Sequence, residues 1–115
     1  MITMSDRIFE LRTYLANPGK LAALQTRFRD HTLALFARHS MDVVAFFTPT
    51  DGENADRTLV YLLAFPDRAT ADRAWDDFRA DPDWIKAKAD SEVDGVLTER
   101  VDSVFLVPTG YSPLH

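Results

Sequence analysis

The chain contains no cysteine among its 115 residues. Without thiols it forms neither disulfides nor cysteine-ligated metal sites, and no cysteine acts as a nucleophile. Basic residues are also few, because 13 Lys and Arg stand against 18 Asp and Glu, which gives a formal net charge of −5. Nucleic-acid binding needs a dense basic patch, so this charge balance argues against a nucleic-acid partner.

Long apolar runs are also absent, and none approaches the roughly 20 residues that a membrane-spanning helix needs. The N-terminal stretch MITMSDR lacks the basic and then apolar organisation of a signal peptide. The lack of cysteine fits a reducing compartment. Together these features predict a cytoplasmic protein without membrane insertion.

Hydrophobic residues, in contrast, make up 46% of the sequence, with eight Phe, three Tyr and two Trp. This composition is typical of folded globular proteins. The length suits one domain, and no linker or internal repeat divides the chain. We therefore expect residues 1–115 to form a single domain.

Hydrophobic periodicity and turn residues predict strands and helices in the order βαββαβ. The four strands are expected at residues 7–15, 42–48, 58–65 and 96–107. The first helix is expected to start at Asn17 and Pro18 and to run to about Ser40. The second helical region, capped by Asp67, is expected to break at Asp81, followed by a first-turn proline. This order predicts a ferredoxin-like α+β fold, with four antiparallel strands and the helices on one face of the sheet.

The sheet is expected to be apolar on both faces. The stretches VVAFF, TLVYLLAF and VFLV are apolar at successive positions, so each strand presents hydrophobic groups on either side. The helices cover only one side, and a wet apolar face of that size is unusual for a monomer. The sequence therefore predicts a homodimer in which two sheets pack face to face.

The first strand carries polar side chains on one side only. Alternation divides it into one set with Phe9, Leu11, Thr13 and Leu15 and another with Ile8, Glu10, Arg12 and Tyr14. The first set is more apolar, so we expect it to face the helices. The second set is then expected to face the sheet of the partner.

Four motifs in this order resemble the NIPSNAP family: FELRTYLANPGKL, FRDHTLALFARHS, DPDW and PTGYSPL. The resemblance runs from about Phe9 to Leu114. It implies the dimeric α/β barrel superfamily, in which two ferredoxin-like sheets close around a central cavity. It brings no settled activity or cofactor, and therefore no catalytic residue. The chain departs from the family after the first helix, where relatives commonly carry a glycine and this sequence has HSMD.

Five residues are candidates for binding a ligand: Glu10, Arg12, Tyr14, His31 and Tyr61. The guanidinium of Arg12 suits a carboxylate, and Glu10 suits a hydroxyl group or the role of a base. An ion pair between Glu10 and Arg12, within the chain or across a dimer interface, is the favoured alternative. The two tyrosines either line the same cavity or simply pack in the core.

Proton transfer would fall to His31, Glu10 or Tyr14. His31 lies at the edge of the first helix's apolar stripe, whereas His39 lies at the helix C-terminus, where the helix dipole favours it. A structural role is favoured for both histidines. The three histidines lack the spacing of metal ligands, and the chain has no glycine-rich phosphate loop. We therefore predict no metal site and no cofactor.

Three functions remain open from the sequence. The first is a homodimeric module that binds a small apolar or aromatic molecule or mediates an interaction. The second is a cofactor-independent monooxygenase or isomerase acting on such a molecule. The third is haem binding, which needs a histidine beside an apolar slot. The wider barrel superfamily includes cofactor-independent monooxygenases, isomerases and haem-handling enzymes. The resemblance implies these functions only through the shared fold.

Overall fold

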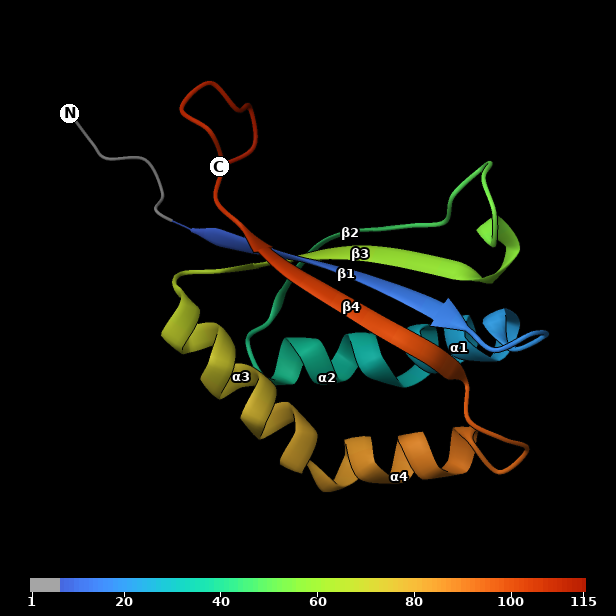
Figure 1. Ribbon diagram of the computed structural model, residues 1–115. Helices are drawn as coiled ribbons and strands as arrows, with labels where there is room; N and C mark the ends of the chain where they lie inside the picture. The colour runs from blue at the N-terminus through green and yellow to red at the C-terminus, as the bar shows by residue number, and fades with distance from the viewer. Residues whose placement is uncertain (1–6) are drawn as a thin grey trace.

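Figure 1 shows the computed structural model, which describes residues 7–115. Residues 1–6 lie outside the described residues. They include most of the stretch MITMSDR, for which we expected no signal peptide. The strands are β1 (Ile8–Ala16), β2 (Asp42–Phe47), β3 (Thr58–Phe65) and β4 (Thr98–Leu106). The helices are α1 (Leu21–Arg27), α2 (Leu33–Arg38), α3 (Arg68–Ala80) and α4 (Pro82–Ser91), with a π-helical turn η1 (Phe28–Thr32) and a 3₁₀ turn η2 (Ala55–Arg57).

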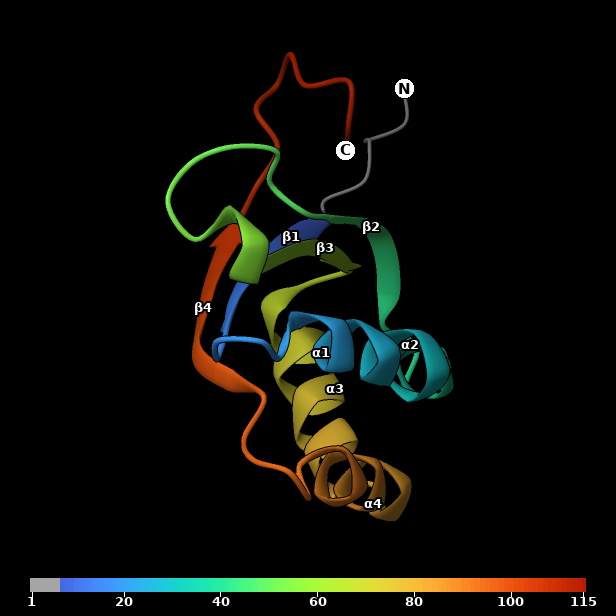
Figure 2. The same ribbon diagram turned by 90° about the vertical axis from the view of Figure 1, so that its right-hand side faces the viewer.

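The four strands form one antiparallel sheet in the order β2-β3-β1-β4. The helices lie together on one face of it, and the C-terminal tail lies on the opposite side (Figures 1 and 2). Central pairing of the first and third strands is the ferredoxin-like topology, so the predicted α+β fold is confirmed. No helix in residues 7–115 is long and apolar enough to cross a membrane.

The first helix begins later than the sequence indicates. Asn17 does not cap it, because its side-chain Nδ2 donates to the Val96 carbonyl at 2.8 Å. Residues 17–20 form a turn in which the Lys20 N–H donates to the Asn17 carbonyl, with Gly19 at φ +77°. Proline second and a positive-φ glycine third are the signature of a type II turn. The same Asn-Pro-Gly residues that suit a helix start therefore make the turn before it.

The break in the second helical region occurs as predicted. The Asp67 carboxylate accepts a hydrogen bond from the Thr70 N–H at 2.7 Å and caps α3. The Asp81 carboxylate accepts from the Asp83 N–H at 2.9 Å and caps α4. Both interactions satisfy backbone donors that a helix N-terminus leaves open.

The core lies between the sheet and the helices and is strongly aromatic. Its buried rings pack edge-on or tilted, with centroids between 5.2 and 6.4 Å apart. The buried aromatic members are Tyr14, Phe28, Phe36, Tyr61, Phe65, Trp75 and Phe78. Each large ring buries much apolar surface, so this layer is the main source of the stability of the fold.

The opposite face of the sheet is largely uncovered and mostly apolar. Its polar members include Thr13, Arg100 and Asp102. Strand register places Leu11, Leu62 and Val104 on this face, and the Val104 side chain is 48% exposed. At one end, the Arg7 guanidinium donates to the carbonyl of His115 at 2.6 Å, so the tail returns to β1 of its own chain. The remainder of this surface is called the open face below.

The first helical layer ends in a Schellman motif at Ser40. The Met41 N–H donates to the Phe36 carbonyl at 2.8 Å, the Ser40 N–H donates to the Ala37 carbonyl, and Ser40 has φ +58°. Glycine is the residue that fits this left-handed position without steric cost. The position falls within HSMD, the stretch where the resemblance drawn from the sequence implies a glycine. Ser40 therefore adopts the left-handed conformation that the Schellman motif requires, and this conformation strains its backbone.

We expect Ser40→Gly to raise the free energy of unfolding by about 1 kcal/mol, because it removes the strain of a Cβ in the left-handed region. Urea denaturation followed by circular dichroism measures this change. The matched variant Ser40→Ala retains the Cβ and should give no such gain. Equal effects of the two variants would contradict the strain at this position.

Candidate functional site

The polar side of β1 faces the helices, which overturns the expected orientation. Glu10 is only 2% exposed and accepts a hydrogen bond from Trp75 of α3, and Tyr14 packs edge-on against Phe28. The apolar set that includes Leu11 therefore lies on the open face. Strand alternation separates the two sets correctly but does not decide which one meets the helices. The polar groups are buried here because they satisfy one another and find partners on α3 and β4.

The carboxylate of Glu10 accepts three hydrogen bonds. Its Oε1 accepts from the indole N–H of Trp75 at 2.6 Å. Its Oε2 accepts from Arg12 Nη1 at 2.9 Å and from the Ser103 hydroxyl at 2.6 Å. Both oxygens are thus occupied by donors from α3, β1 and β4. A carboxylate engaged in this way is an anchor for its neighbours rather than a free base.

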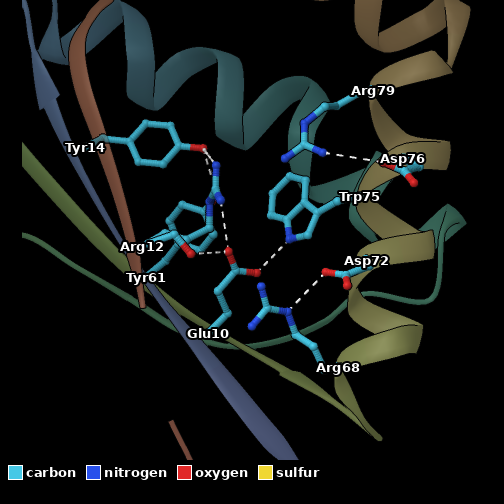
Figure 3. Close-up of polar contacts among 10 residues, drawn as sticks. Glu10, Arg12, Tyr14, Tyr61, Arg68, Asp72, Trp75, Asp76 and Arg79 are labelled. Carbon is cyan, nitrogen blue, oxygen red and sulfur yellow. Dashed lines mark hydrogen bonds and ion pairs between the residues drawn. The ribbon is translucent and has the colours of Figure 1, made fainter. Parts of the chain in front are cut away.

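The guanidinium of Arg12 is held by three oxygen acceptors and an aromatic ring. Besides Glu10, its Nε donates to the Tyr61 hydroxyl at 2.8 Å and its Nη2 to the Tyr14 hydroxyl at 3.1 Å. Its central carbon lies 4.1 Å from the Trp75 ring centroid (Figure 3). Burial lowers the pKa of Arg12, but the neighbouring oxygens of Tyr14, Tyr61 and Glu10 outweigh it and raise the pKa above its ordinary value. Arg12 is therefore a fixed cation.

The two tyrosines complete the polar network. Their hydroxyl groups lie 2.9 Å apart, and Tyr61 is fully buried. Burial, reinforced by Tyr14, raises the pKa of Tyr61 well above its ordinary value despite the opposing effect of Arg12. Tyr61 therefore remains a protonated phenol that donates or accepts a hydrogen bond, and it does not serve as a base.

A cavity of about 210 Å³ opens beside this network, between the sheet and the helices. Its wall consists of six aromatic rings, three cations and one threonine. These residues are Arg12, Tyr14, Phe28, Thr32, Phe36, Trp75, Phe78, Arg79, Trp84 and Lys88. The helical segments η1, α2, α3 and α4 all contribute, so the cavity exists only when α3 and α4 pack against the first helical layer. We call it the helix-side cavity.

The π-helical turn η1 shapes one wall of the helix-side cavity. The Leu33 N–H donates to the Phe28 carbonyl five residues earlier, which marks the turn as π-helical. Phe28 and Thr32 begin and end it, and both are buried and line the cavity. π-turns within α-helices are frequent at functional sites. This irregularity therefore falls where the wall of a binding site would be.

The structure brings together four of the five predicted site residues. Glu10, Arg12, Tyr14 and Tyr61 form one connected network, and the favoured intrachain ion pair between Glu10 and Arg12 is present. His31 is separate from them: it is exposed and lies in a groove between α2 and α4.

His39 bonds Asp81 at 2.8 Å, away from the cavity. None of the three histidines lines the helix-side cavity.

Sequence reasoning missed the partners supplied by the helices and by β4. From its spacing beside Ala and Phe, Trp75 was interpreted as a core or interface residue rather than a ligand contact, and Ser103 is one polar residue of the last predicted strand. Arg79 and Lys88 belong to helices whose charge pattern is typical of a solvated surface. No local pattern identifies these four residues, because each reaches the site through tertiary packing.

The NIPSNAP family model matches residues 9–113, nearly the whole chain. The chain belongs to the NIPSNAP family. This confirms the resemblance drawn from the sequence motifs. Among curated proteins, no match to this chain was found.

Solved structures of similar fold include other NIPSNAP proteins. One from Agrobacterium tumefaciens is 19% identical with a TM-score of 0.86, covering 100% of this chain and 96% of that one. A second from the same organism, described as of unknown function, is 22% identical with a TM-score of 0.83, covering 98% and 97%. SnoaB, a cofactor-independent oxygenase from Streptomyces nogalater, is 18% identical with a TM-score of 0.61, covering 94% and 98%. At these identities, the likeness shows a shared fold.

We expect Glu10→Gln to lower the free energy of unfolding by about 3 kcal/mol, because it leaves the buried Arg12 cation without its counter-charge. Glutamine also has only one carbonyl oxygen, whereas donors approach both ends of the Glu10 carboxylate. An amide N–H would therefore face another donor. Chemical denaturation at neutral pH measures the loss.

The matched control is Asp72→Asn, which removes the carboxylate of an exposed ion pair with Arg68 on α3. Exposed pairs of this kind contribute little, so the control should change stability by less than about 1 kcal/mol. A loss for Glu10→Gln no larger than that of Asp72→Asn would show that the buried pair does not organise the site.

Proposed function

We propose that this NIPSNAP protein is a homodimeric small-molecule-binding module whose ligand occupies the helix-side cavity of each protomer. The observation that carries the proposal is the composition of the cavity wall, with six aromatic rings around a few fixed polar groups. Concave, mostly aromatic cavities with a small number of oriented polar groups are typical of ligand sites. Arg12 is already oriented by Glu10, Tyr14 and Tyr61, so little ordering is needed on binding.

Size and wall chemistry favour a small aromatic ligand. A cavity of about 210 Å³ is somewhat larger than the roughly 150 Å³ of an apolar cavity known to hold benzene. The rings of Phe28, Phe36 and Phe78 offer edges and faces at several angles, which suits a planar aromatic partner. We therefore propose a ligand of the predicted apolar or aromatic class, bound inside one chain rather than between two sheets.

A cofactor-independent oxygenase or isomerase is the second candidate, and the shared fold with SnoaB favours it. Such an enzyme needs a group that moves a proton inside the cavity. Glu10 is occupied by three donors, His31 lies outside the cavity, and Tyr61 stays protonated. Of the three proposed proton-transfer residues, only Tyr14 lines the cavity. The positions of these residues therefore support ligand binding better than proton transfer in the cavity.

Haem binding is disfavoured by the positions of the histidines. A histidine axial ligand must point into an apolar slot. His31 lies in the groove between α2 and α4, and His39 is paired with Asp81. The wall of the helix-side cavity contains no histidine.

Dimerisation remains part of the proposal because the open face is mostly apolar. Strand register makes Leu11, Leu62 and Val104 neighbours on it. A second copy presenting the same face would bury this surface in a two-fold arrangement. The cavity lies on the other side of the sheet, so each protomer would keep its own site.

We expect benzene, a neutral probe, to bind once per protomer and to raise the melting temperature, because a ligand that binds only the folded state stabilises it. Trp75 and Trp84 are the two tryptophans of the chain and both line the cavity, so the emission of tryptophan should also change. Thermal unfolding and fluorescence titration measure both effects.

The control is Thr32→Met, which places a longer apolar side chain in the cavity wall and should abolish both effects. Its fold is checked by circular dichroism. A melting temperature and emission unaffected by benzene in the unaltered protein would contradict the proposal. Equal effects of benzene on the Thr32→Met variant would place the binding elsewhere.

We expect the protein to be a dimer at micromolar concentration and Val104→Asp to make it monomeric, because the variant buries an unpaired carboxylate in the sheet-to-sheet contact. Light scattering after size-exclusion chromatography measures the mass. Val93→Asp, at a 77% exposed position between α4 and β4, should leave the mass unchanged. A monomeric unaltered protein would contradict the assembly.

A further inference from the structure

The helix-side cavity is positively charged as well as aromatic. Three of its ten lining residues, Arg12, Arg79 and Lys88, are cations, and no Asp or Glu is among these ten. Cavity walls of one charge sign concentrate ligands of the opposite sign. The charge of the whole chain is −5, so this local excess of positive charge runs against the overall composition.

Two guanidinium groups approach the same indole. The central carbon of Arg12 lies 4.1 Å from the Trp75 ring centroid, and that of Arg79 lies 5.2 Å from it (Figure 3). Like charges held this close to one ring repel each other, and the Glu10 carboxylate, which pairs with Arg12 at 2.9 Å, compensates one of the two. Within residues 7–115, the one carboxylate paired with Arg79 is that of Asp76, at 3.9 Å and with a side chain 81% exposed. Arg79 therefore retains most of its capacity to bind an anion.

The other two cations also have unused donors. Arg12 has five N–H groups, of which its bonds to Tyr61, Glu10 and Tyr14 engage three. Lys88 contacts Glu92 only at 3.5 Å, and its side chain is about half exposed. Donors from β1, α3 and α4 thus converge on one cavity from different directions.

A fourth cation adds to the positive potential behind the aromatic wall. The Arg27 guanidinium is buried and lies 5.0 Å from the Trp84 ring centroid. Its contact with Glu92 is 3.5 Å long, and its buried Nε has no hydrogen-bond partner among the described residues. Burial lowers the pKa of Arg27 against the opposing effect of Glu92. A nearby anion would compensate this poorly paired charge.

We infer that the ligand of the helix-side cavity is a monocyclic aromatic carboxylate, a molecule the size of benzoate. Its ring contacts the aromatic wall, and its carboxylate accepts hydrogen bonds from Arg79 and Lys88 with Arg12 nearby. A planar carboxylate matches the donor fork of a guanidinium. The volume limits the ligand to one ring with a short substituent. This inference rests on the proposed function and specifies its ligand class.

The test compares two probes of the same shape that differ in charge. Isothermal titration calorimetry of the full chain is performed with benzoate and with benzamide. We expect benzoate to bind at least about 10-fold more tightly, the scale of one charge-assisted hydrogen bond. Raising sodium chloride from about 0.05 to 0.5 M should weaken benzoate binding and leave benzamide binding unchanged.

Variants at the cavity mouth assign the charge to particular residues. Arg79→Gln and Lys88→Gln should each weaken benzoate binding about 3- to 10-fold without changing benzamide binding. Both side chains are more than half exposed, so the variants should fold. Lys86→Gln, on the same helix as Lys88 but outside the cavity, is the matched control and should bind benzoate normally.

Three results would overturn the inference. Equal affinity for benzoate and benzamide, or tighter binding of benzamidine than of benzoate, would show that the cavity does not select an anion. Benzene binding with no binding of benzoate would do the same while leaving the proposed function intact. Failure of benzene to bind, in contrast, would count against the proposed function itself.

Discussion

The buried ion pair between Glu10 and Arg12 is the interaction on which the rest of the site depends. Two charges separated from water are stable only when their remaining hydrogen-bonding capacity is met. Trp75, Ser103, Tyr14 and Tyr61 meet that requirement from four different elements. The pair therefore ties α3, β3 and β4 to β1. It also fixes the direction in which Arg12 presents its unused donors to the cavity.

Local features of the fold were predictable because their causes lie within a few residues. Asp67 and Asp81 cap helices through backbone donors two or three residues away, and strand alternation extends over a single element. The Asn17 cap was wrong for a related reason. Asn-Pro-Gly is compatible with a helix start and with a type II turn, and the distant Val96 carbonyl, which binds the Asn17 side chain, selects the turn.

The predicted orientation of β1 was wrong because the preference of each side chain for burial was judged without its hydrogen-bond partners. On their own, Glu10 and Arg12 are poor core residues, so the apolar set seemed better suited to the helices. The missing information was the set of donors and acceptors that α3, β3 and β4 bring to them. Once Trp75, Ser103 and Tyr61 are present, the polar set is the one that the helix side can satisfy.

The residues of the candidate site that lie on strand β1 could be predicted from the sequence, whereas those that lie on helices could not. Glu10, Arg12 and Tyr14 share one strand side, so their proximity followed from alternation alone. Arg79 and Lys88 lie on helices with carboxylates three or four residues away, a pattern typical of solvated surfaces. Only the packing of α3 and α4 over the sheet shows that these two cations also border an aromatic cavity.

The corrected orientation puts the face proposed for dimerisation and the proposed ligand site on opposite sides of the sheet. If both used the same face of the sheet, as a central cavity between two sheets implies, a change in one would disturb the other. Here the alternation of β1 assigns Leu11 to the open face and Arg12 to the helix-side cavity. Ligand selection can therefore change through α3 and α4, which form the cavity mouth, while the face proposed for dimerisation stays constant. The sheet thus lies between the face proposed for dimerisation and the helices that border the cavity.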